Sequence, residues 1–372
     1  MKTSDSNKVW RAGSYSFGEL TARRIFLPGD SLTEGSGGST FRTQFMSRLR
    51  AKFGDGGVGI GHIDDTREGA FALDNVTGTD IAGISSWADS RRTKSFFGRG
   101  RYWNNAAAGT LNKQNLAGAS SPYGSVTLWV EFTNSSQTVK IKPYFGAGTK
   151  EITYTASSFA LNTPVPLHFP LSVENTSYVG IAVTVNTNGA NDLFIWADDW
   201  HLTTPTSGVQ FTNAATGGSS IADWVSLDAA RFATWMSIVR PYAMTLDLGM
   251  NDRGSGLSNA NPYIDKIPAT APVYRNMETL VQRFQSGYPK VRGLLIAPND
   301  TDDRATTIIG YYPEMYRAIA ADAGWAFFND QDLLGLFAAA VAAGYMVNGN
   351  VHPTSLGNDR RGNAYADVFS LA

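Results

Sequence analysis

The stretch "RRIFLPGDSLTEGSGGS", Arg23–Ser39, decides the fold expected for this chain. It begins with two basic residues and a short apolar run, continues with Gly29-Asp30-Ser31-Leu32, and ends in a loop rich in glycine. A short apolar run closed by a turn signal is typical of a buried strand. We therefore expect Ser31 to lie at the carboxyl end of a strand. Residues 41–53 then place apolar side chains at helical spacing, which predicts a helix.

Strand-like and helical segments alternate in the C-terminal part of the chain, from about residue 208 onward. Helical spacing of apolar residues occurs in 270–287 and 306–324. Between these lie short β-branched or apolar runs, "GVQFTNAAT", "YAMTLDLGMND", "KVRGLLIAPND" and "GWAFFNDQD". Strands that alternate with helices predict a parallel sheet covered by helices on both faces.

The middle of the chain has a different period. Runs such as "SVTLWVEFT", "TVKIKPYF" and "YVGIAVTVN" are β-branched and aromatic, and Asn, Ser and Gly clusters separate them. Short strands at regular spacing predict a β-sandwich, which we expect to be jelly-roll-like. The predicted organisation is an α/β domain made of residues 21–70 and 206–372, an inserted sandwich at 71–205, and a linker segment at 1–20.

Composition narrows the class of protein. Hydrophobic residues make up 42% of the 372 residues and charged residues 17%, which is ordinary for a soluble globular protein. The formal net charge of -1 argues against a nucleic-acid partner or an anionic membrane surface. The chain has no cysteine, which excludes disulfides, thiolate catalysis and cysteine-based zinc sites. No segment is apolar over enough residues to predict a membrane span.

Candidate chemical groups follow several of the predicted strands. Ser31 follows the first, the glycines of "NAATGGSSIAD" follow the strand near 210, and Asn251 follows "TLDLG". His352 lies in "NGNVHPTSLGN", before the last helix. The carboxyl ends of parallel strands form the ligand crevice of such a sheet. A serine there becomes a nucleophile if a base and oxyanion donors lie within reach, so His352 is the candidate base.

These four pieces, in this order, resemble the blocks of the SGNH/GDSL hydrolase family. They are 29–32 (Gly-Asp-Ser-Leu), 213–219, 249–252 (Gly-Met-Asn-Asp) and 351–353 (Val-His-Pro). The resemblance implies a flavodoxin-like, three-layer α/β/α domain that hydrolyses carboxylic esters without a metal or other cofactor. It assigns Ser31 as nucleophile and His352 as base. The oxyanion hole would consist of the backbone N–H groups of Ser31 and Gly218 and the side chain of Asn251, with Gly217 as the alternative to Gly218.

One position departs from the family pattern. The family has an aspartate three residues before the histidine, and here that residue is Gly349, between Asn348 and Asn350. A backbone carbonyl or an asparagine could orient His352 and give a Ser-His dyad. Another carboxylate at a strand end, Asp300 or Asp330, could supply the third member. The site could also be inactive.

The glycine-rich stretch "FGDGGVGIGHIDD", 53–65, lacks the ending of a phosphate-binding loop and follows a helix rather than a strand. We interpret it as a turn near the mouth of the site. His62 lies beside two aspartates there, but the spacing does not support a metal site. No metal is expected elsewhere.

The inserted region contains Trp129, Trp196 and Trp200, with Tyr102 and Trp103 just before its longer strands. Such rings stack on sugar faces, although most rings in a sandwich belong to its core. SGNH esterases with an inserted sandwich commonly act on acetylated polysaccharides. We therefore expect removal of O-acetyl groups from a bacterial surface polysaccharide. The alternatives are an esterase for small acyl esters or lipids and a non-catalytic glycan-binding or structural domain.

No signal peptide is visible at the N-terminus "MKTSDSNKVW", which fits poorly with an extracellular substrate. A bacteriophage tail-spike or tail-fibre esterase would reconcile the two, because it needs no signal and is exposed on the virion. A homotrimer would fit such a tail protein, although no repeat in the sequence demonstrates it. A secreted bacterial esterase that has lost its leader accounts for the same facts.

Overall fold

The computed structural model describes residues 23–34, 40–65, 71–74, 82–84, 89–104, 107–116, 122–143, 151–171, 179–188, 192–204, 207–254, 267–303 and 307–370. The predicted linker, 1–20, lies outside these residues. The chain divides into two compact units, Met1–Gly56 with Ser207–Ala372, and Gly57–Thr206. No helix in the described part of the chain is long and apolar enough to cross a membrane.

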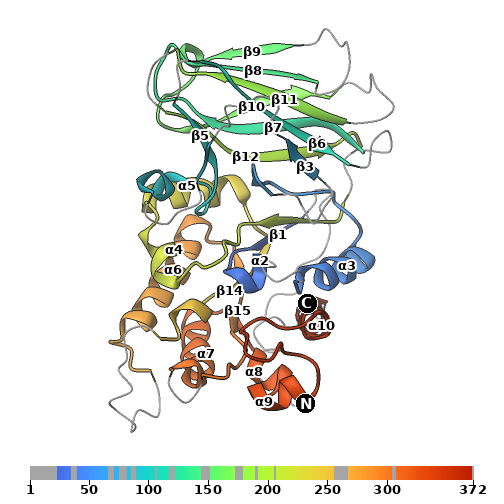
Figure 1. Cartoon of the computed structure of the whole chain (residues 1–372), viewed down its shortest axis with the longest axis vertical. Coiled ribbons are helices and arrows are strands. Elements are labelled where there is room, and N and C mark those ends of the chain that lie inside the picture. The colour runs from blue at the N-terminus through green and yellow to red at the C-terminus, as the bar shows by residue number, and fades with distance from the viewer. Residues whose placement is uncertain are drawn as a thin grey trace. The chain divides into compact units, whose positions relative to one another are not determined.

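The first unit is built on a five-stranded sheet in the order β13-β1-β14-β15-β16, and all its neighbouring strands are parallel (Figure 1). The expected parallel sheet is therefore confirmed. Its strands are β1 (Arg23–Leu27), β13 (Val209–Asn213), β14 (Ala243–Asp247), β15 (Arg292–Ala297) and β16 (Ala326–Asn329).

Helices cover both faces of this sheet. Ile25 and Leu27 of β1 pack into a core shared with α3 and α10, whereas Phe26 contacts Phe284 of α6 edge to face. Successive residues of a strand point to opposite faces, so this alternation produces the three layers. Figure 1 shows α3 and α10 on one side of the sheet and α4 to α6 on the other. The helices are α2 (Ser31–Glu34), α3 (Arg42–Phe53), α4 (Ile221–Ser226), α5 (Ala229–Val239), α6 (Pro272–Gly287), α7 (Tyr312–Ala323), α8 (Asp330–Leu334), α9 (Phe337–Ala342) and α10 (Ser355–Ser370).

The second unit is a β-sandwich of two antiparallel sheets around one apolar core. One sheet has the order β10-β7-β12-β5-β4, with β2 paired to β12, and the other has the order β3-β6-β11-β8-β9. Their strands are β2 (Gly61–His62), β3 (Phe71–Asp74), β4 (Ala82–Gly83), β5 (Arg101–Trp103), β6 (Gly109–Asn115), β7 (Tyr123–Glu131), β8 (Thr138–Pro143), β9 (Ile152–Thr155), β10 (Pro164–Pro170), β11 (Val179–Asn186) and β12 (Leu193–Leu202).

The sandwich unit begins earlier in the chain than the sequence suggested. The structure divides the chain after Gly56, whereas the sequence placed the start of the insert at residue 71. The glycine-rich stretch contributes β2, which pairs with β12, and His62 is buried there. Because this strand is only two residues long, no alternation of apolar residues could reveal it.

Trp103 and Trp200, two of the rings considered as sugar platforms, belong to the apolar core of the sandwich, whereas Trp196 is buried outside that core. Trp196 and Trp200 are fully buried and Trp103 is nearly so. The Trp196 indole N–H donates to Glu131 Oε2, and its ring stacks on Phe194. Trp129 is half-buried and lies on β7 between core residues Leu128 and Val130, so it points to the opposite face of the sheet.

Candidate active site

Ser31 is the first residue of α2, directly after the turn that follows β1. Gly29 forms an isolated parallel bridge with Asp247 at the end of β14. A Cβ at Gly29 would overlap the Thr33 side chain and the Asp247 carbonyl oxygen, so only glycine allows this close approach. Asp30 Oδ1 accepts a hydrogen bond of 2.9 Å from the backbone N–H of Leu32 and fixes the first turn of α2. Gly29 before Ser31, and the hydrogen bond between Asp30 and Leu32 around it, therefore hold Ser31 at the end of the strand.

The structure brings together two side chains that the sequence separates by 321 positions. His352 Nε2 lies 2.9 Å from Ser31 Oγ. The Ser31 side chain is almost buried, at 9% exposure, and His352 is partly buried. This distance lies within the hydrogen-bond reach that a general base needs.

Asn350 holds the other side of the imidazole ring. Its Oδ1 lies 2.8 Å from His352 Nδ1 and 3.1 Å from the backbone nitrogen of His352. A backbone N–H can only donate, so the shared atom is the amide oxygen, and Nδ1 must carry the hydrogen that faces it. Nε2 is then the acceptor for the Ser31 hydroxyl, which is the tautomer that a base requires.

The pKa of His352 is lowered from its usual value, chiefly because partial burial disfavours the charged ring and secondly because the Arg361 guanidinium repels a second positive charge. In this site the imidazole bonds to a neutral amide rather than to a carboxylate. His352 is therefore predominantly neutral at neutral pH.

Neither carboxylate considered as a third member bonds to His352. Asp300 Oδ2 accepts from the backbone N–H of Phe337 at the start of α9, at 2.9 Å. Asp330 accepts from Arg361 Nε at 2.7 Å and from Tyr365 Oη at 2.6 Å. The prediction that Asp300 or Asp330 is the third member is therefore wrong, because both carboxylates accept hydrogen bonds from other groups. Gly349, at the position expected for aspartate, has φ +68° in the turn that leads to Asn350.

The expected oxyanion donors lie on segments that hydrogen bonds tie to the Ser31 turn. Gly218 follows β13 and has φ +72°, whereas Gly217 does not have a positive φ. The backbone N–H of Thr216, in the same turn, donates to the Gly29 carbonyl at 3.0 Å. Asn251 Nδ2 donates to the Ser219 carbonyl at 2.9 Å. An amide nitrogen has two hydrogens, so Asn251 retains a second one for a substrate.

Tyr316 and Ile221, which lie outside the four sequence blocks and were not predicted, hold these segments in place. Asn251 belongs to the 3₁₀ turn Met250–Asp252, whose preceding residue Gly249 has φ +116°. A Cβ at Gly249 would overlap the Tyr316 hydroxyl, which donates to the Leu248 carbonyl. Asp252 Oδ2 accepts from the backbone N–H of Ile221 at 2.8 Å, so the same turn also holds the start of α4.

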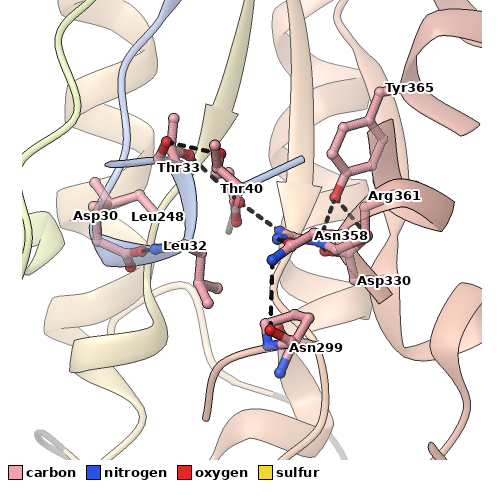
Figure 2. Close-up of polar contacts among 12 residues, drawn as sticks. Asp30, Leu32, Thr33, Thr40, Leu248, Asn299, Asp330, Asn358, Arg361 and Tyr365 are labelled. Atoms are coloured by element: carbon pink, nitrogen blue, oxygen red, sulfur yellow. Dashed lines mark hydrogen bonds and ion pairs between the residues drawn. The ribbon is translucent and has the colours of Figure 1, made fainter. Parts of the chain in front are cut away.

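Arg361 is fully buried in α10 and connects the strand ends to the histidine loop. It lies beside Asp330, Asn358 and Tyr365 (Figure 2). Its guanidinium donates to Asp247 at 2.6 Å, to Asp330 at 2.7 Å and to Asn358 Oδ1 at 3.1 Å. Asn358 Nδ2 is 3.5 Å from the carbonyl oxygen of Pro353, next to His352. Nothing in the sequence singles out Arg361, because a polar face on a terminal helix is ordinarily exposed to solvent.

The described part of the chain contains no group of three or more histidine, aspartate or glutamate side chains that could hold a metal ion. The site itself places a neutral imidazole beside a serine hydroxyl, with polar donors on neighbouring segments.

The comparisons with known proteins concern the fold. No family model and no curated protein matches the sequence. A solved peptidoglycan O-acetylesterase matches with a TM-score of 0.68 at 16% identity, over 98% of this chain and 94% of the other. An acetyl xylan esterase from Geobacillus stearothermophilus has a TM-score of 0.31 at 15% identity, over 44% of this chain and 74% of its own. A GDSL-like lipase from Bacteroides thetaiotaomicron has a TM-score of 0.32 at 16% identity, over 44% and 77%.

The first of these matches spans both units, and the other two are too distant to establish a common fold. A parallel sheet between helices, joined to a β-sandwich, is thus a known combination of units. The α/β/α domain with an inserted β-sandwich, which the sequence led us to expect, is confirmed.

Proposed function

We propose that this chain, which has the fold of the SGNH hydrolases, is a serine esterase in which Ser31 is the nucleophile and His352 the general base. One observation carries the proposal, the 2.9 Å separation of His352 Nε2 and Ser31 Oγ with Nδ1 held by Asn350. In this reaction Nε2 takes the hydroxyl proton as Oγ attacks the ester carbonyl, and then passes it to the leaving alcohol. Water hydrolyses the acyl-enzyme by the same proton route.

The developing oxyanion would accept hydrogen bonds from the backbone N–H groups of Ser31 and Gly218 and from Asn251 Nδ2. The bonds from Thr216 to Gly29 and from Asn251 to Ser219 support this, because they hold all three segments to one another. Donors that are fixed before the reaction stabilise the transition state without reorganisation, and each is worth about 10²–10³ in rate.

Asn350 is the proposed third member. Replacing the aspartate of a serine protease triad by asparagine costs about 10⁴ in kcat, because the imidazole then adopts the wrong tautomer. Here the amide presents its oxygen to Nδ1, so the tautomer is the right one. Some rate is still lost, because a neutral asparagine does not supply the negative charge that stabilises the imidazolium. A working site of moderate rate is the expected result.

The substrate we propose is an O-acetylated polysaccharide of a bacterial surface. A solved protein that matches nearly the whole chain is a peptidoglycan O-acetylesterase, which supports an acetyl ester on a glycan. The sandwich also carries polar and aromatic side chains on the sheet face opposite its core. Thr127 Oγ1 bonds to His201 Nε2 at 2.9 Å on that face. Trp129, two residues after Thr127 in β7, points to the same face. A tryptophan ring combines an apolar body with a polar N–H, which suits it to a partly wet binding surface of the kind that a glycan needs.

The two alternative functions, a non-catalytic glycan-binding domain and an esterase for small acyl esters or lipids, differ in the active-site groups and substrates that they require. A non-catalytic glycan-binding domain does not require a serine hydroxyl bonded to an imidazole, so the 2.9 Å contact argues against it. An esterase for lipids would prefer longer acyl chains. The virion location and the homotrimer stay predictions of the sequence.

The test measures acetate release from an O-acetylated bacterial polysaccharide and from p-nitrophenyl acetate. Ser31→Ala and His352→Ala should each lose at least about 10³-fold in kcat/KM. Ser237→Ala, which removes an exposed hydroxyl on α5, should match the wild type and serves as the control. Equal rates for the wild type and Ser31→Ala on both substrates would sink the proposal. Activity on p-nitrophenyl esters alone, rising with chain length, would favour the lipid alternative.

A further inference from the structure

Two buried carboxyl groups, those of Asp30 and Asp247, belong to the strand ends that carry the proposed nucleophile Ser31. Asp30 precedes Ser31, and Asp247 ends β14, the strand next to β1. Both side chains are fully buried, at 0% exposure. The backbone N–H of Asp30 donates to the Asp247 carbonyl at 3.3 Å, so the two residues are neighbours at the strand ends. Figure 2 shows Asp30 beside Leu32, with Thr33 in the same short helix α2 as Leu32.

Each of these carboxyl groups has one satisfied oxygen and one without a donor. Asp30 Oδ1 accepts from Leu32 N–H, while its Oδ2 has no hydrogen-bond partner among the described residues. Asp247 Oδ2 accepts from Arg361 and Thr33, while its Oδ1 likewise has none in the described structure. A buried ionised carboxylate normally accepts hydrogen bonds on both oxygens. At least one of the two groups is therefore poorly arranged for a negative charge.

The charge balance identifies which group is neutral. Arg361 is the cation that bonds to the buried carboxylates here, and it donates to Asp247 and Asp330 but not to Asp30. The other groups whose charges act on Asp30 are Asp247 on β14 and Asp252 after it, and both are acidic. His352 and the buried phenol Tyr316 on α7 are neutral at pH 7, since the pKa of His352 is lowered and that of Tyr316 is raised. Of the three fully buried acids Asp30, Asp247 and Asp330, Asp30 is thus the one to which the guanidinium does not bond.

We propose that Asp30 carries a proton at neutral pH and positions Ser31 as a neutral acid, and that its ionisation impairs the esterase at alkaline pH. As a neutral acid, Asp30 still accepts from Leu32 N–H through Oδ1, and it avoids burying a charge without a counter-ion, which costs far more than burying an unpaired hydroxyl at Oδ2. As an anion, it would place a second negative charge beside the Ser31 backbone, where the transition state also becomes negative. The kinetic part rests on the proposed function, whereas the protonation state does not.

Burial and the neighbouring charge both favour a protonated Asp30. Burial, and then the nearby charge of Asp247, raise the pKa of Asp30 to about 8. An acid whose pKa is higher in the folded chain than in the unfolded chain loses stabilisation as pH rises between the two values. Asp30 therefore makes the fold less stable at pH 9 than at pH 6, and so, with the same sign, does Asp252, whose pKa is raised to about 7.

The decisive variant is Asp30→Asn, because an amide has the shape and the neutrality of the protonated acid. The matched control is Asp330→Asn, since Asp330 accepts on both oxygens, from Arg361 and from Tyr365. Urea unfolding at pH 6 and pH 9 compares the stability of the wild type and the two variants. A titration of Asp carboxyl carbons by ¹³C NMR reports the protonation directly, with the Asp30 signal assigned by its loss in Asp30→Asn.

The expected results are distinct for each arm. Asp30→Asn should unfold at a urea concentration equal to or above that of the wild type at pH 9, while Asp330→Asn should unfold earlier at both pH values. The Asp30 carboxyl signal should titrate near pH 8. On p-nitrophenyl acetate, corrected with Ser31→Ala, wild-type kcat/KM at pH 9 should be about tenfold below its neutral plateau. Asp30→Asn should lack that alkaline decrease.

An Asp30 signal that titrates below pH 5, or an Asp30→Asn variant that is destabilised at pH 6 as strongly as Asp330→Asn, would overturn the proposal. An alkaline decrease that persists in Asp30→Asn would refute the kinetic part. If the wild type hydrolysed no ester at all, the proposed function would fail, and the unfolding and NMR arms would still decide the state of Asp30.

Discussion

Asn350 accepts two hydrogen bonds from His352 on a single oxygen, from Nδ1 at 2.8 Å and from the backbone nitrogen at 3.1 Å. The amide occupies the side of the imidazole ring where a catalytic triad has its acid. The two residues belong to one short turn, so the base and its holder are fixed together. The first prediction depends on this relationship.

Asn350→Asp should raise kcat/KM by about tenfold at neutral pH, because a carboxylate stabilises the imidazolium that forms in the transition state. It should also raise the pKa of His352 and move the acid limb of the pH profile to higher pH. The measurement is kcat/KM on p-nitrophenyl acetate between pH 4 and pH 9. Asn348→Asp adds the same charge to the same exposed turn and is the control. An equal gain in both variants would mean that general electrostatics, not the Nδ1 contact, is responsible.

The wild-type enzyme should stay active below the pH at which an ordinary histidine becomes protonated, about 6.5. The base acts only when neutral, and partial burial and Arg361 lower the pKa of His352, so the neutral form persists to lower pH. The acid limb of kcat/KM reports this pKa in the free enzyme. A limb centred above pH 7 would contradict the assignment of His352 as the base.

Asn251→Ala should reduce kcat by about 10²–10³ while KM changes little, since its amide is proposed to bond to the oxyanion rather than to the ground state. The variant also loses the bond to Ser219, worth about 1 kcal/mol, so the fold should remain intact. Steady-state kinetics together with thermal unfolding separate the two effects. A loss of activity that only follows a loss of folded protein would argue for a purely structural Asn251.

Arg361→Met should destabilise the fold by about 3–5 kcal/mol, because it leaves buried Asp247 and Asp330 without their cation. The comparison is Arg48→Met, which breaks an exposed pair with Asp367 and should cost at most about 1 kcal/mol. Urea denaturation at pH 7 measures both. If Arg361→Met lowered the free energy of unfolding as little as Arg48→Met does, the buried Asp247 and Asp330 would have to be neutral in the variant.

Periodicity and turn chemistry identified most of the first unit. The apolar run before Ser31 and the alternation of strands and helices after residue 208 predicted the parallel sheet, because buried strands and amphipathic helices impose those periods. Short or irregular elements escaped this reasoning. The two-residue strand β2 and the burial of Trp196 against Glu131 depend on partners more than 60 residues away.

The sequence by itself determined the chemical groups and their order along the chain, namely Ser31, Gly218, Asn251 and His352, each beside a local signal such as a turn or a strand end. Only the tertiary structure decided which groups meet. It placed Nε2 of His352 against Ser31, gave Nδ1 to Asn350, and engaged Asp300 and Asp330 with Phe337 N–H and Arg361. The physical reason is that a hydrogen bond depends on atoms lying within about 3 Å of each other, and the folding of distant segments sets that distance.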